Sequence, residues 1–351
     1  MPKDNLEHVE SAAAAGLRYV SDSMAGIRRK RTGRGFVYLD VSGSPIRNGT
    51  ELARIKALVI PPAWTDVWVC PIPDGHIQVT ARDAKGRKQY RYHPRYREIR
   101  DETKFGRMLD FSELLPVLRD LVERDLLLPG LARDKVLASV VRLLEKTLIR
   151  VGNDEYARDN KSYGLTTMRR RHVEVTGHTL RFDFRGKSGM MHSVAVTDRR
   201  VARIVQHCQE LPGQVLFQYL DDDGKRQTVD AGDINDYLRR ATGREITAKD
   251  FRTWSGTMLA AFELRALGPA STEKEAKANV VHAVDRVAKR LGNTRAVCRK
   301  YYIHPVVLKS YLDGMVLPAA PQPSDQKRER PSGALRRDEL VVLEFIQSQL
   351  D

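Results

Sequence analysis

Cysteine is scarce in this chain of 351 residues, which contains only Cys70, Cys208 and Cys298. The three form no Cys-x-x-Cys pair and have no zinc-type spacing with the nine histidines. This pattern argues against a disulfide framework and against a zinc site. We therefore expect a protein of a reducing compartment that holds no metal.

Long apolar runs are missing as well. No stretch reaches the about 18 uninterrupted apolar residues of a transmembrane helix, and residues 1–5 contain no apolar signal core. The sequence therefore predicts a cytoplasmic protein with no membrane partner.

Positive charge, by contrast, is abundant. Lysine and arginine number 60 against 45 aspartates and glutamates, which gives a net charge of +15 and a pI near 9.8. Such an excess favours a polyanionic partner, because Lys and Arg displace condensed counterions from phosphate backbones. Nucleic acid is the leading interpretation, and a basic protein without such a partner is the alternative.

The predicted elements divide the chain into three parts. Short β-prone segments separated by turn formers cover residues 35–40, 66–70, 76–80 and 89–92. After residue 104 the apolar residues follow helical spacing. We expect an α+β protein with a small antiparallel β-rich domain (1–103), a mainly α-helical domain (104–316), and a Pro-rich charged linker with a C-terminal helix (317–351).

One hairpin interrupts the helical part. Residues 180–184 and 192–196 alternate in polarity on either side of a glycine-bearing turn, which places Lys187 at the tip. The turn is not a nucleotide-binding P-loop, because a P-loop lysine opens a helix and does not join two strands. Lys187 is either a solvated turn residue or a general acid.

Arg252 is the single charged residue between Phe251 and Phe262, on a helix that begins with a capping box of Thr247 and Asp250. A guanidinium among apolar neighbours is costly unless it is paired. Either a carboxylate or a substrate phosphate satisfies it.

Arg150 is predicted to close the helix that precedes it, where an arginine complements the helix dipole whether or not it has another role. Gly152 and Asn153 then end one helix and cap the next, whose first turn exposes Asn153 and Tyr156. Such a helix fits a DNA major groove, where asparagine pairs with adenine.

Tyr302 lies on a predicted amphipathic helix that Pro305 ends, a setting typical of packing tyrosines. A tyrosine also attacks phosphodiesters when cations neutralise the phosphorus oxygens and an acid protonates the leaving oxygen. Arg150, Arg252 and Lys187 have the side chains for those tasks.

Residues 86–93 interleave basic and aromatic side chains at strand period. Gln89 and Arg91 share one face of this strand, and Tyr90 and Tyr92 share the other. The segment is either a solvated edge strand protected by charge or a strand that contacts DNA through Gln89, Tyr90 and Tyr92. The high pI favours DNA.

Eight sequence blocks occur in order across the two main domains. They are IPPAW (60–64), GHIQ (75–78), GRKQYRY (86–92), IRVG (149–152), YGLTT (163–167), FRGKSG (184–189), KDFRTW (249–254) and RKYYIHP (299–305). With these blocks the chain resembles the poxvirus-like bacterial DNA topoisomerase IB family over about residues 15–315.

The resemblance implies a monomeric enzyme of the bacterial nucleoid whose domains clamp double-stranded DNA. It would relax positive and negative supercoils without ATP, metal or another cofactor. Tyr302 would form a 3′-phosphotyrosyl link and leave a free 5′-hydroxyl. Arg150 and Arg252 would bind the nonbridging phosphate oxygens, and Lys187 would be the general acid.

The chain departs from the poxvirus and nuclear members at Asn293, where those members have histidine. An asparagine still donates a hydrogen bond to a phosphate oxygen, but it carries no charge. Asn293 also lies in an ordinary helix start, Gly292-Asn293-Thr294, so a purely structural role stays open.

Two other classes of protein are alternatives. A tyrosine recombinase uses the same chemistry, but it usually has a histidine three residues before the second arginine, where this chain has Lys249, and it lacks the β domain. A basic architectural protein would explain the charge but not the four residues suited to catalysis.

Overall fold

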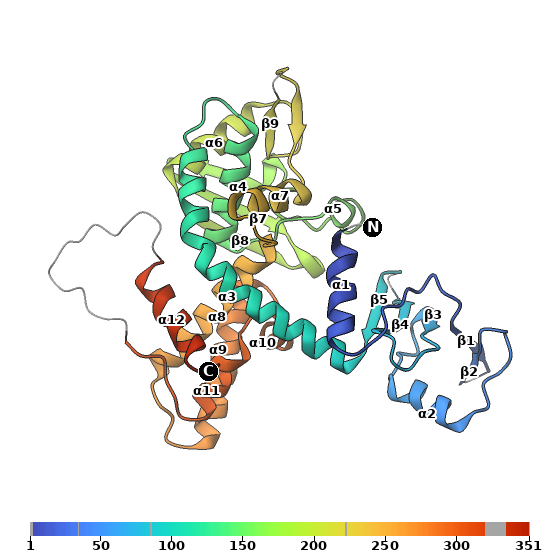
Figure 1. Cartoon of the computed structure of the whole chain (residues 1–351). Helices are drawn as coiled ribbons and strands as arrows, with labels where there is room; N and C mark the ends of the chain where they lie inside the picture. Colours follow the sequence, from blue (N-terminus) through green and yellow to red (C-terminus); the bar gives the residue numbers. More distant parts are fainter. Residues whose placement is uncertain (1–2, 34, 85, 222, 320–334, 351) are drawn as a thin grey trace. The chain divides into compact units, whose positions relative to one another are not determined.

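The computed structural model describes residues 3–33, 35–84, 86–221, 223–319 and 335–350. The chain divides into two compact units, residues 1–106 and 107–351 (Figure 1). Antiparallel sheets and numerous helices make it an α+β protein, as the sequence predicts. The boundary between the units falls within the long helix α3 (Pro94–Asp125), and most of the predicted linker lies outside the described residues.

The first unit contains a five-stranded antiparallel sheet in the order β2-β1-β3-β4-β5. Its strands are β1 (Ile27–Thr32), β2 (Gly35–Leu39), β3 (Thr65–Val69), β4 (Ile77–Arg82) and β5 (Lys88–Tyr92), and its helices are α1 (Lys3–Ala14) and α2 (Gly49–Ala57). Four of these strands were predicted. The sequence pattern missed β1, because four of its six residues are basic and hide the strand period.

Alternate residues of β3, together with Cys70 directly after it, pack on opposite faces of this sheet. Val67 and Val69 join Ile55 of α2 in one apolar cluster, whereas Trp68 and Cys70 join Val20 in another. Because side chains alternate along a strand, both faces of the sheet are covered and the register of β3 is set.

The second unit is mainly helical. Its helices after α3 are α4 (Arg133–Thr147), α5 (Asp154–Asn160), α6 (Arg199–Glu210), α7 (Ala231–Thr242), α8 (Ala248–Leu267), α9 (Glu273–Leu291), α10 (Arg295–Tyr301), α11 (Pro305–Leu312) and α12 (Arg337–Gln347). Its strands are β6 (Val173–Thr176), β7 (Thr179–Arg185) and β8 (Met191–Thr197), which form one antiparallel sheet, and the pair β9 (Gln218–Leu220) and β10 (Arg226–Thr228). Helix α4 packs against α6, α7, α8 and β8, and α8 packs against α9.

Two predicted helix limits are wrong. Helix α4 ends at Thr147, where Leu148 adopts the left-handed conformation, so Arg150 lies beyond the helix and does not close it. Helix α10 ends at Tyr301, Tyr302 is its cap, and Pro305 begins the next helix. Tertiary contacts of Leu148 and Tyr302, described below, override the apolar periodicity that suggested longer helices.

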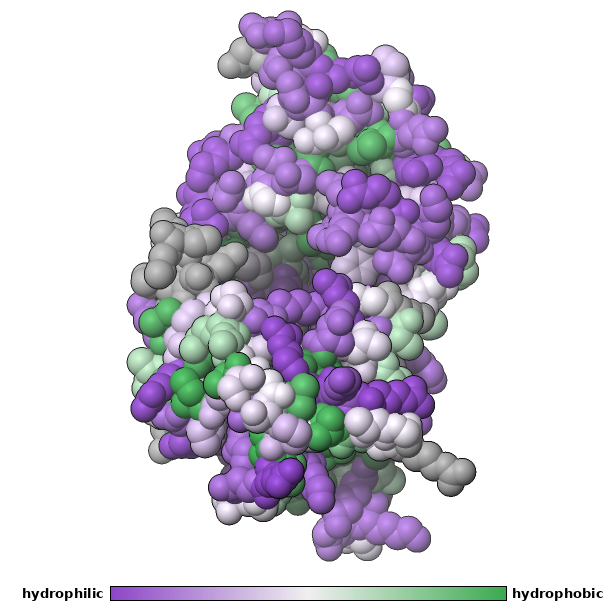
Figure 2. All heavy atoms as spheres, turned by 90° about the vertical axis from the view of Figure 1, so that its right-hand side faces the viewer, coloured by the Kyte–Doolittle hydropathy of each residue, from purple (hydrophilic) through white to green (hydrophobic). Residues whose placement is uncertain are grey.

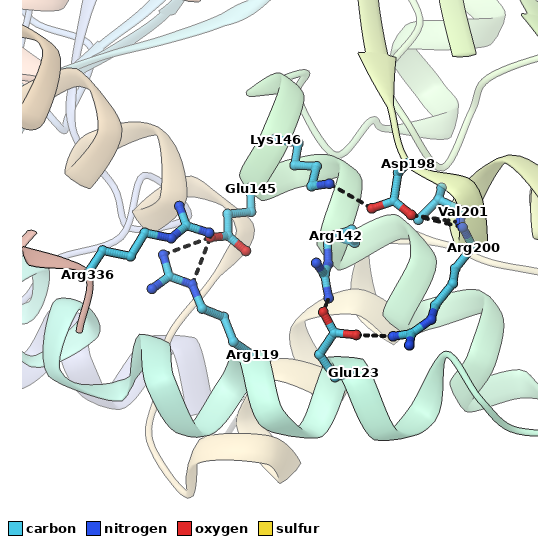
Figure 3. Close-up of polar contacts among 9 residues, drawn as sticks. All are labelled: Arg119, Glu123, Arg142, Glu145, Lys146, Asp198, Arg200, Val201 and Arg336. Carbon is cyan, nitrogen blue, oxygen red and sulfur yellow. Dashed lines mark hydrogen bonds and ion pairs between the residues drawn. The ribbon is translucent and has the colours of Figure 1, made fainter. Parts of the chain in front are cut away.

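An ion-pair cluster, part of which Figure 3 shows, joins the C-terminal helix α12 to α3 and α4. Arg119 of α3 donates to both carboxylate oxygens of Glu339, at 2.8 and 2.6 Å, and lies 2.7 Å from Glu145 of α4. Arg336, the N-cap of α12, reaches the same Glu145 at 3.2 Å. Burial alone would raise the pKa of Glu339, but Arg119 outweighs it and lowers the pKa below its ordinary value.

A second cluster in Figure 3 holds α4 against α3 and α6. Glu123 of α3 accepts hydrogen bonds from Arg142 of α4 and from Arg200 of α6. Lys146, near the end of α4, pairs at 2.7 Å with Asp198, which caps α6. The C-terminal half of α4 is therefore held on two sides.

Within the described residues, no helix is both long enough and apolar enough to cross a membrane. Figure 2 shows one face of the molecule, where hydrophilic side chains predominate and apolar ones occur in small groups. This surface agrees with a chain of which 30% is charged.

Glu339→Ala removes one partner of the buried pair and leaves Arg119 with Glu145 alone. Breaking a buried pair costs about 3–5 kcal/mol, and because Arg119 keeps one partner we expect the free energy of unfolding to fall by about 3 kcal/mol in urea denaturation. The matched control is Glu344→Ala, an exposed glutamate of the same helix, which should change it by less than about 0.5 kcal/mol.

The effect of Glu339→Ala should also depend on pH. Because folding lowers the pKa of Glu339, its contribution is fully present above the ordinary glutamate pKa and disappears as pH falls through the folded value. A difference between wild type and variant that grows on acidification would contradict the assignment.

Candidate active site

One pocket of the second unit, with a volume of about 330 Å³, gathers residues from segments far apart in the sequence. It is lined by Arg150, Lys187, Arg252, Tyr302, Asn153 and Tyr156, and also by Val151, Gly152, Ser162, Tyr163, Ala248 and Lys249. The first six of these residues are sequence-predicted site residues. The fold therefore brings them together on one surface.

Arg252 is buried near the start of α8, after the predicted capping box of Thr247 and Asp250. Its Nη2 donates to the carbonyl of Leu291, the last residue of α9, at 2.7 Å, and its Nη1 donates to the carbonyl of Leu148, the cap of α4. Carbonyl groups at helix C-termini lack intrahelical donors and form the negative end of the helix dipole. The sequence suggested a carboxylate or a phosphate as the partner of Arg252. Within the protein, the carbonyl groups of two helix ends stabilise the cation instead.

Arg150 lies in an irregular segment after α4. Its carbonyl accepts a hydrogen bond from the Leu165 backbone at 2.9 Å, and the next carbonyl, of Val151, accepts one from Thr166 at 2.7 Å. The Arg150 Nη2 donates to Oδ1 of Asn293. Burial, with a smaller contribution from the nearby Arg252 charge, lowers the pKa of Arg150 to about 10, so the guanidinium is charged at neutral pH.

Neither Arg150 nor Arg252 pairs with a carboxylate in the part of the chain that the structure describes. Burial lowers the pKa of Arg252 too, and its Nε is buried without a hydrogen-bond partner. Two adjacent cations without a carboxylate partner, Arg252 buried and Arg150 half-buried, favour the binding of an anion. This part of the pocket is suited to a phosphate group.

Tyr302 caps α10 and faces Arg252, whose guanidinium carbon lies 5.2 Å from the centre of the tyrosine ring. Gly256, one helical turn after Arg252, allows this approach, because a Cβ atom there would lie 2.4 Å from the Tyr302 carbonyl oxygen. The backbone nitrogen of His304 donates to Oγ1 of Thr257 at 3.0 Å. The tyrosine segment is therefore held directly against α8.

Lys187 lies in the turn between β7 and β8, where the alternating pattern predicts it. The turn is a single 3-10 turn, Lys187–Gly189, and a hydrogen bond of 2.7 Å from the Gly186 nitrogen to the Met190 carbonyl closes it. The Lys187 side chain is exposed and lines the pocket. The ammonium group and the tyrosine therefore reach the same pocket from segments that are far apart in the sequence.

Asn153 and Tyr156 belong to the short helix α5, as predicted. The Asn153 Oδ1 caps the helix by accepting a hydrogen bond from the Tyr156 nitrogen at 2.9 Å, and both side chains are exposed. The capping bond occupies the amide oxygen of Asn153, which leaves its amide nitrogen as the group that can contact a ligand.

Asn293 does not line the pocket but lies behind Arg150. Its Oδ1 accepts the hydrogen bond from Arg150, and its Nδ2 is buried near the Cys298 thiol without a hydrogen-bond partner. The cap of α10 is Thr294, which accepts from the Val297 nitrogen at 3.3 Å. Asn293 is therefore not the helix cap.

Gln89, Tyr90 and Tyr92 lie on the edge strand β5 of the first unit. The rings of Tyr90 and Tyr92 stack with centres 6.0 Å apart, on one face of the strand as its period predicts, and Tyr90 is exposed. The Gln89 amide donates to Asp83 at 3.0 Å.

Lys249 and Tyr163 line the pocket although the sequence patterns gave them no role in it. Lys249 precedes Arg252 by three residues, and that spacing places two helical residues on the same face of a helix. The sequence could therefore have predicted that Lys249 lies beside Arg252. Tyr163 lies outside any helix or strand, and the hydrogen bond of its backbone nitrogen to the Arg185 carbonyl, at 2.8 Å, depends on the tertiary fold.

Comparisons with known proteins cover both parts of the chain. Residues 93–316 match the family model for the catalytic core of eukaryotic DNA topoisomerase I, and residues 35–83 match that for the N-terminal domain of bacterial DNA topoisomerase IB. DNA topoisomerase 1B of Acanthamoeba polyphaga mimivirus is 33% identical over 296 residues, which cover 82% of this chain and 88% of the relative.

The chain therefore belongs to the type IB DNA topoisomerase family. It is an enzyme of the isomerase class, and its substrate is DNA. Arg150, Lys187, Arg252, Asn293 and Tyr302 all lie within the stretch that matches the catalytic core.

Gly256→Ala tests how closely the tyrosine segment must approach α8. The added Cβ, 2.4 Å from the Tyr302 carbonyl oxygen, must displace the tyrosine. A displacement of about 1 Å costs up to about 10²-fold in rate, so we expect the topoisomerase activity to fall by about that factor. Gly106→Ala in α3, where a Cβ meets nothing within 4 Å, is the control and should keep wild-type activity. Equal activity of the two variants would contradict the proposed constraint.

Proposed function

We propose that this pocket cleaves and reseals one strand of duplex DNA through Tyr302. The phenol loses its proton to solvent, its oxygen attacks the phosphorus and forms a bond to it, and the bond to the 5′ oxygen breaks, which leaves a 3′-phosphotyrosine and a 5′-hydroxyl. The observation that carries the proposal is the convergence of Tyr302, Arg150, Arg252 and Lys187 on one pocket. The neighbouring Tyr301 does not line it and is 39% exposed.

Arg150 and Arg252 neutralise the charge that develops on the nonbridging oxygens. Arg252 is buried, Arg150 is half-buried, and both lack a carboxylate partner in the described structure, so their charge is available to the phosphate and is only partly screened by water. Lys187, on an exposed turn, donates a proton to the departing 5′ oxygen.

Resealing reverses these steps. The phosphotyrosine conserves the energy of the broken link, so no ATP is required, and the free 5′ end swivels under torsion before it attacks. Supercoils of either sign relax in this way. Among the described residues, no group of three or more His, Cys, Asp or Glu side chains is placed to hold a metal ion, and in the proposed mechanism the arginines act as the charge clamp.

Asn293 contributes by orienting Arg150. Its amide oxygen accepts from the guanidinium, and its amide nitrogen is buried, so direct donation to a phosphate requires that the amide nitrogen become accessible. A neutral acceptor of this kind fixes the arginine without cancelling its charge.

Five further amide and tyrosine side chains are proposed to contact DNA. Asn153 and Tyr156 line the pocket, and Gln89, Tyr90 and Tyr92 form the candidate surface of the first unit. We propose that the protein acts as a monomer that clamps duplex DNA, as the family resemblance implies.

Tyr302→Phe removes the attacking oxygen. Wild-type protein should relax supercoiled plasmid in EDTA without ATP, and Tyr302→Phe should show no relaxation. Tyr301→Phe is the matched control and should relax plasmid as wild type does. Inactive wild-type protein would overturn the proposal, and site-dependent strand exchange would indicate a recombinase.

Lys187→Ala removes the proposed acid. Cleavage of ordinary DNA should slow by about 10²- to 10⁴-fold, the range for general acid catalysis. A 5′-bridging phosphorothiolate should restore the rate, because sulfur leaves without protonation, whereas Tyr302→Phe should stay inactive on it. If the sulfur substrate restores nothing, Lys187 is not the acid.

A further inference from the structure

His192 of β8 has no role in the chemistry above, yet it lies next to two of the groups that perform it, Arg150 and Arg252. Its ring stacks on Phe184 of β7, with centres 5.2 Å apart and planes 16° from parallel. It also lines a small cavity of about 20 Å³ together with Arg150, Arg252 and Gly186.

Two glycines accommodate the imidazole. A Cβ on Gly186 would lie 2.6 Å from the His192 Cδ2 atom, and a Cβ on Gly292 would lie 2.3 Å from Cε1. Real Cβ atoms essentially never approach other atoms to less than 3.0 Å. The ring therefore packs directly against the backbone at both positions and would exclude any side chain from them.

Each of these glycines precedes a site residue. Gly186 is followed by Lys187, and Gly292 is followed by Asn293, which binds Arg150. The two segments are far apart in the sequence, and the imidazole fills the space between them. A change in the size of this one side chain therefore changes the distance between the Gly186 segment and the Gly292 segment.

We propose that His192 is a positioning residue that sets the distance between the Lys187 turn and the arginine clamp. This inference rests on the proposed role of Lys187 as general acid. Proton transfer requires a heavy-atom distance of about 2.6–3.2 Å to the leaving oxygen, so the position of the turn relative to the bound phosphate controls it.

The ring suits this position because it is uncharged at neutral pH. Burial, followed by the nearby charges of Arg150 and Arg252, lowers the pKa of His192. A lysine or arginine of similar length would add a third positive charge beside the clamp. A neutral planar ring fills the space without that repulsion.

His192→Ala removes the spacer and leaves Lys187 and both arginines in the chain. Cleavage of ordinary duplex DNA should slow by about 10²-fold, the effect of misplacing a reacting group by about 1 Å. The 5′-bridging phosphorothiolate should be cleaved at close to the wild-type rate, because its leaving group needs no acid. Noncovalent DNA affinity should stay unchanged.

Val196→Ala is the matched control, since Val196 lies on the same face of β8, four residues farther from the turn. It should cleave both substrates as wild type does. A variant with a purely structural defect would be slow on both substrates, and that result for His192→Ala would overturn the proposal.

Gly186→Ala tests the same contact without changing the imidazole or any charge. The backbone at Gly186 (φ −95°, ψ −163°) accepts alanine, so the main obstacle is the ring, 2.6 and 2.7 Å from the new Cβ. Gly186→Ala should slow cleavage, but the double variant with His192→Ala should be no slower than His192→Ala alone, because the clash is gone. Additive effects would contradict the contact.

The controls separate this inference from the function on which it rests. If Lys187→Ala is restored by the sulfur substrate and His192→Ala is not, only the positioning role of His192 fails. If Lys187→Ala itself is not restored, the assignment of the acid fails first. Should His192→Ala not fold, Gly186→Ala still shows whether displacing the turn produces the sulfur-dependent rescue.

Discussion

The buried guanidinium of Arg252 is the group on which the site depends. It is held by the carbonyl groups of Leu148 and Leu291, which close α4 and α9. A carboxylate would neutralise its charge, whereas helix ends carry only partial charges and leave most of it for an incoming anion. The two carbonyl groups thus reduce the free-energy cost of burying Arg252, and the guanidinium can still bind a phosphate.

The surrounding fold places other groups around this cation. Ion pairs with α3 and α6 hold the end of helix α4 (Figure 3). The chain then brings Arg150 beside Arg252. Gly256 lets the Tyr302 backbone lie against α8, and the β7–β8 turn supplies Lys187. The site residues therefore lie at or near the ends of rigid elements. A small shift of such an element changes the distances between the site side chains.

Features governed by neighbouring residues were predictable. The capping box of Thr247 and Asp250 and the hairpin around Lys187 occur where the sequence places them, because caps and turns depend on side chains a few residues apart. The limits of α4 and α10 were not predictable, since hydrogen bonds to the Leu148 carbonyl and packing of Tyr302 on Gly256 come from distant segments. Strand β1 was hidden by its basic residues, which pair with neighbouring strands all the same.

The sequence by itself determined the family, the α+β class and the residue types available for chemistry, because ordered motifs and turn signals are local. Only the tertiary structure decided how the charges are satisfied. Arg150 meets Asn293 across 143 residues of sequence, and His192 packs against Gly186 and Gly292 from different elements. Such contacts depend on the path of the whole chain, and neither composition nor periodicity contains that information.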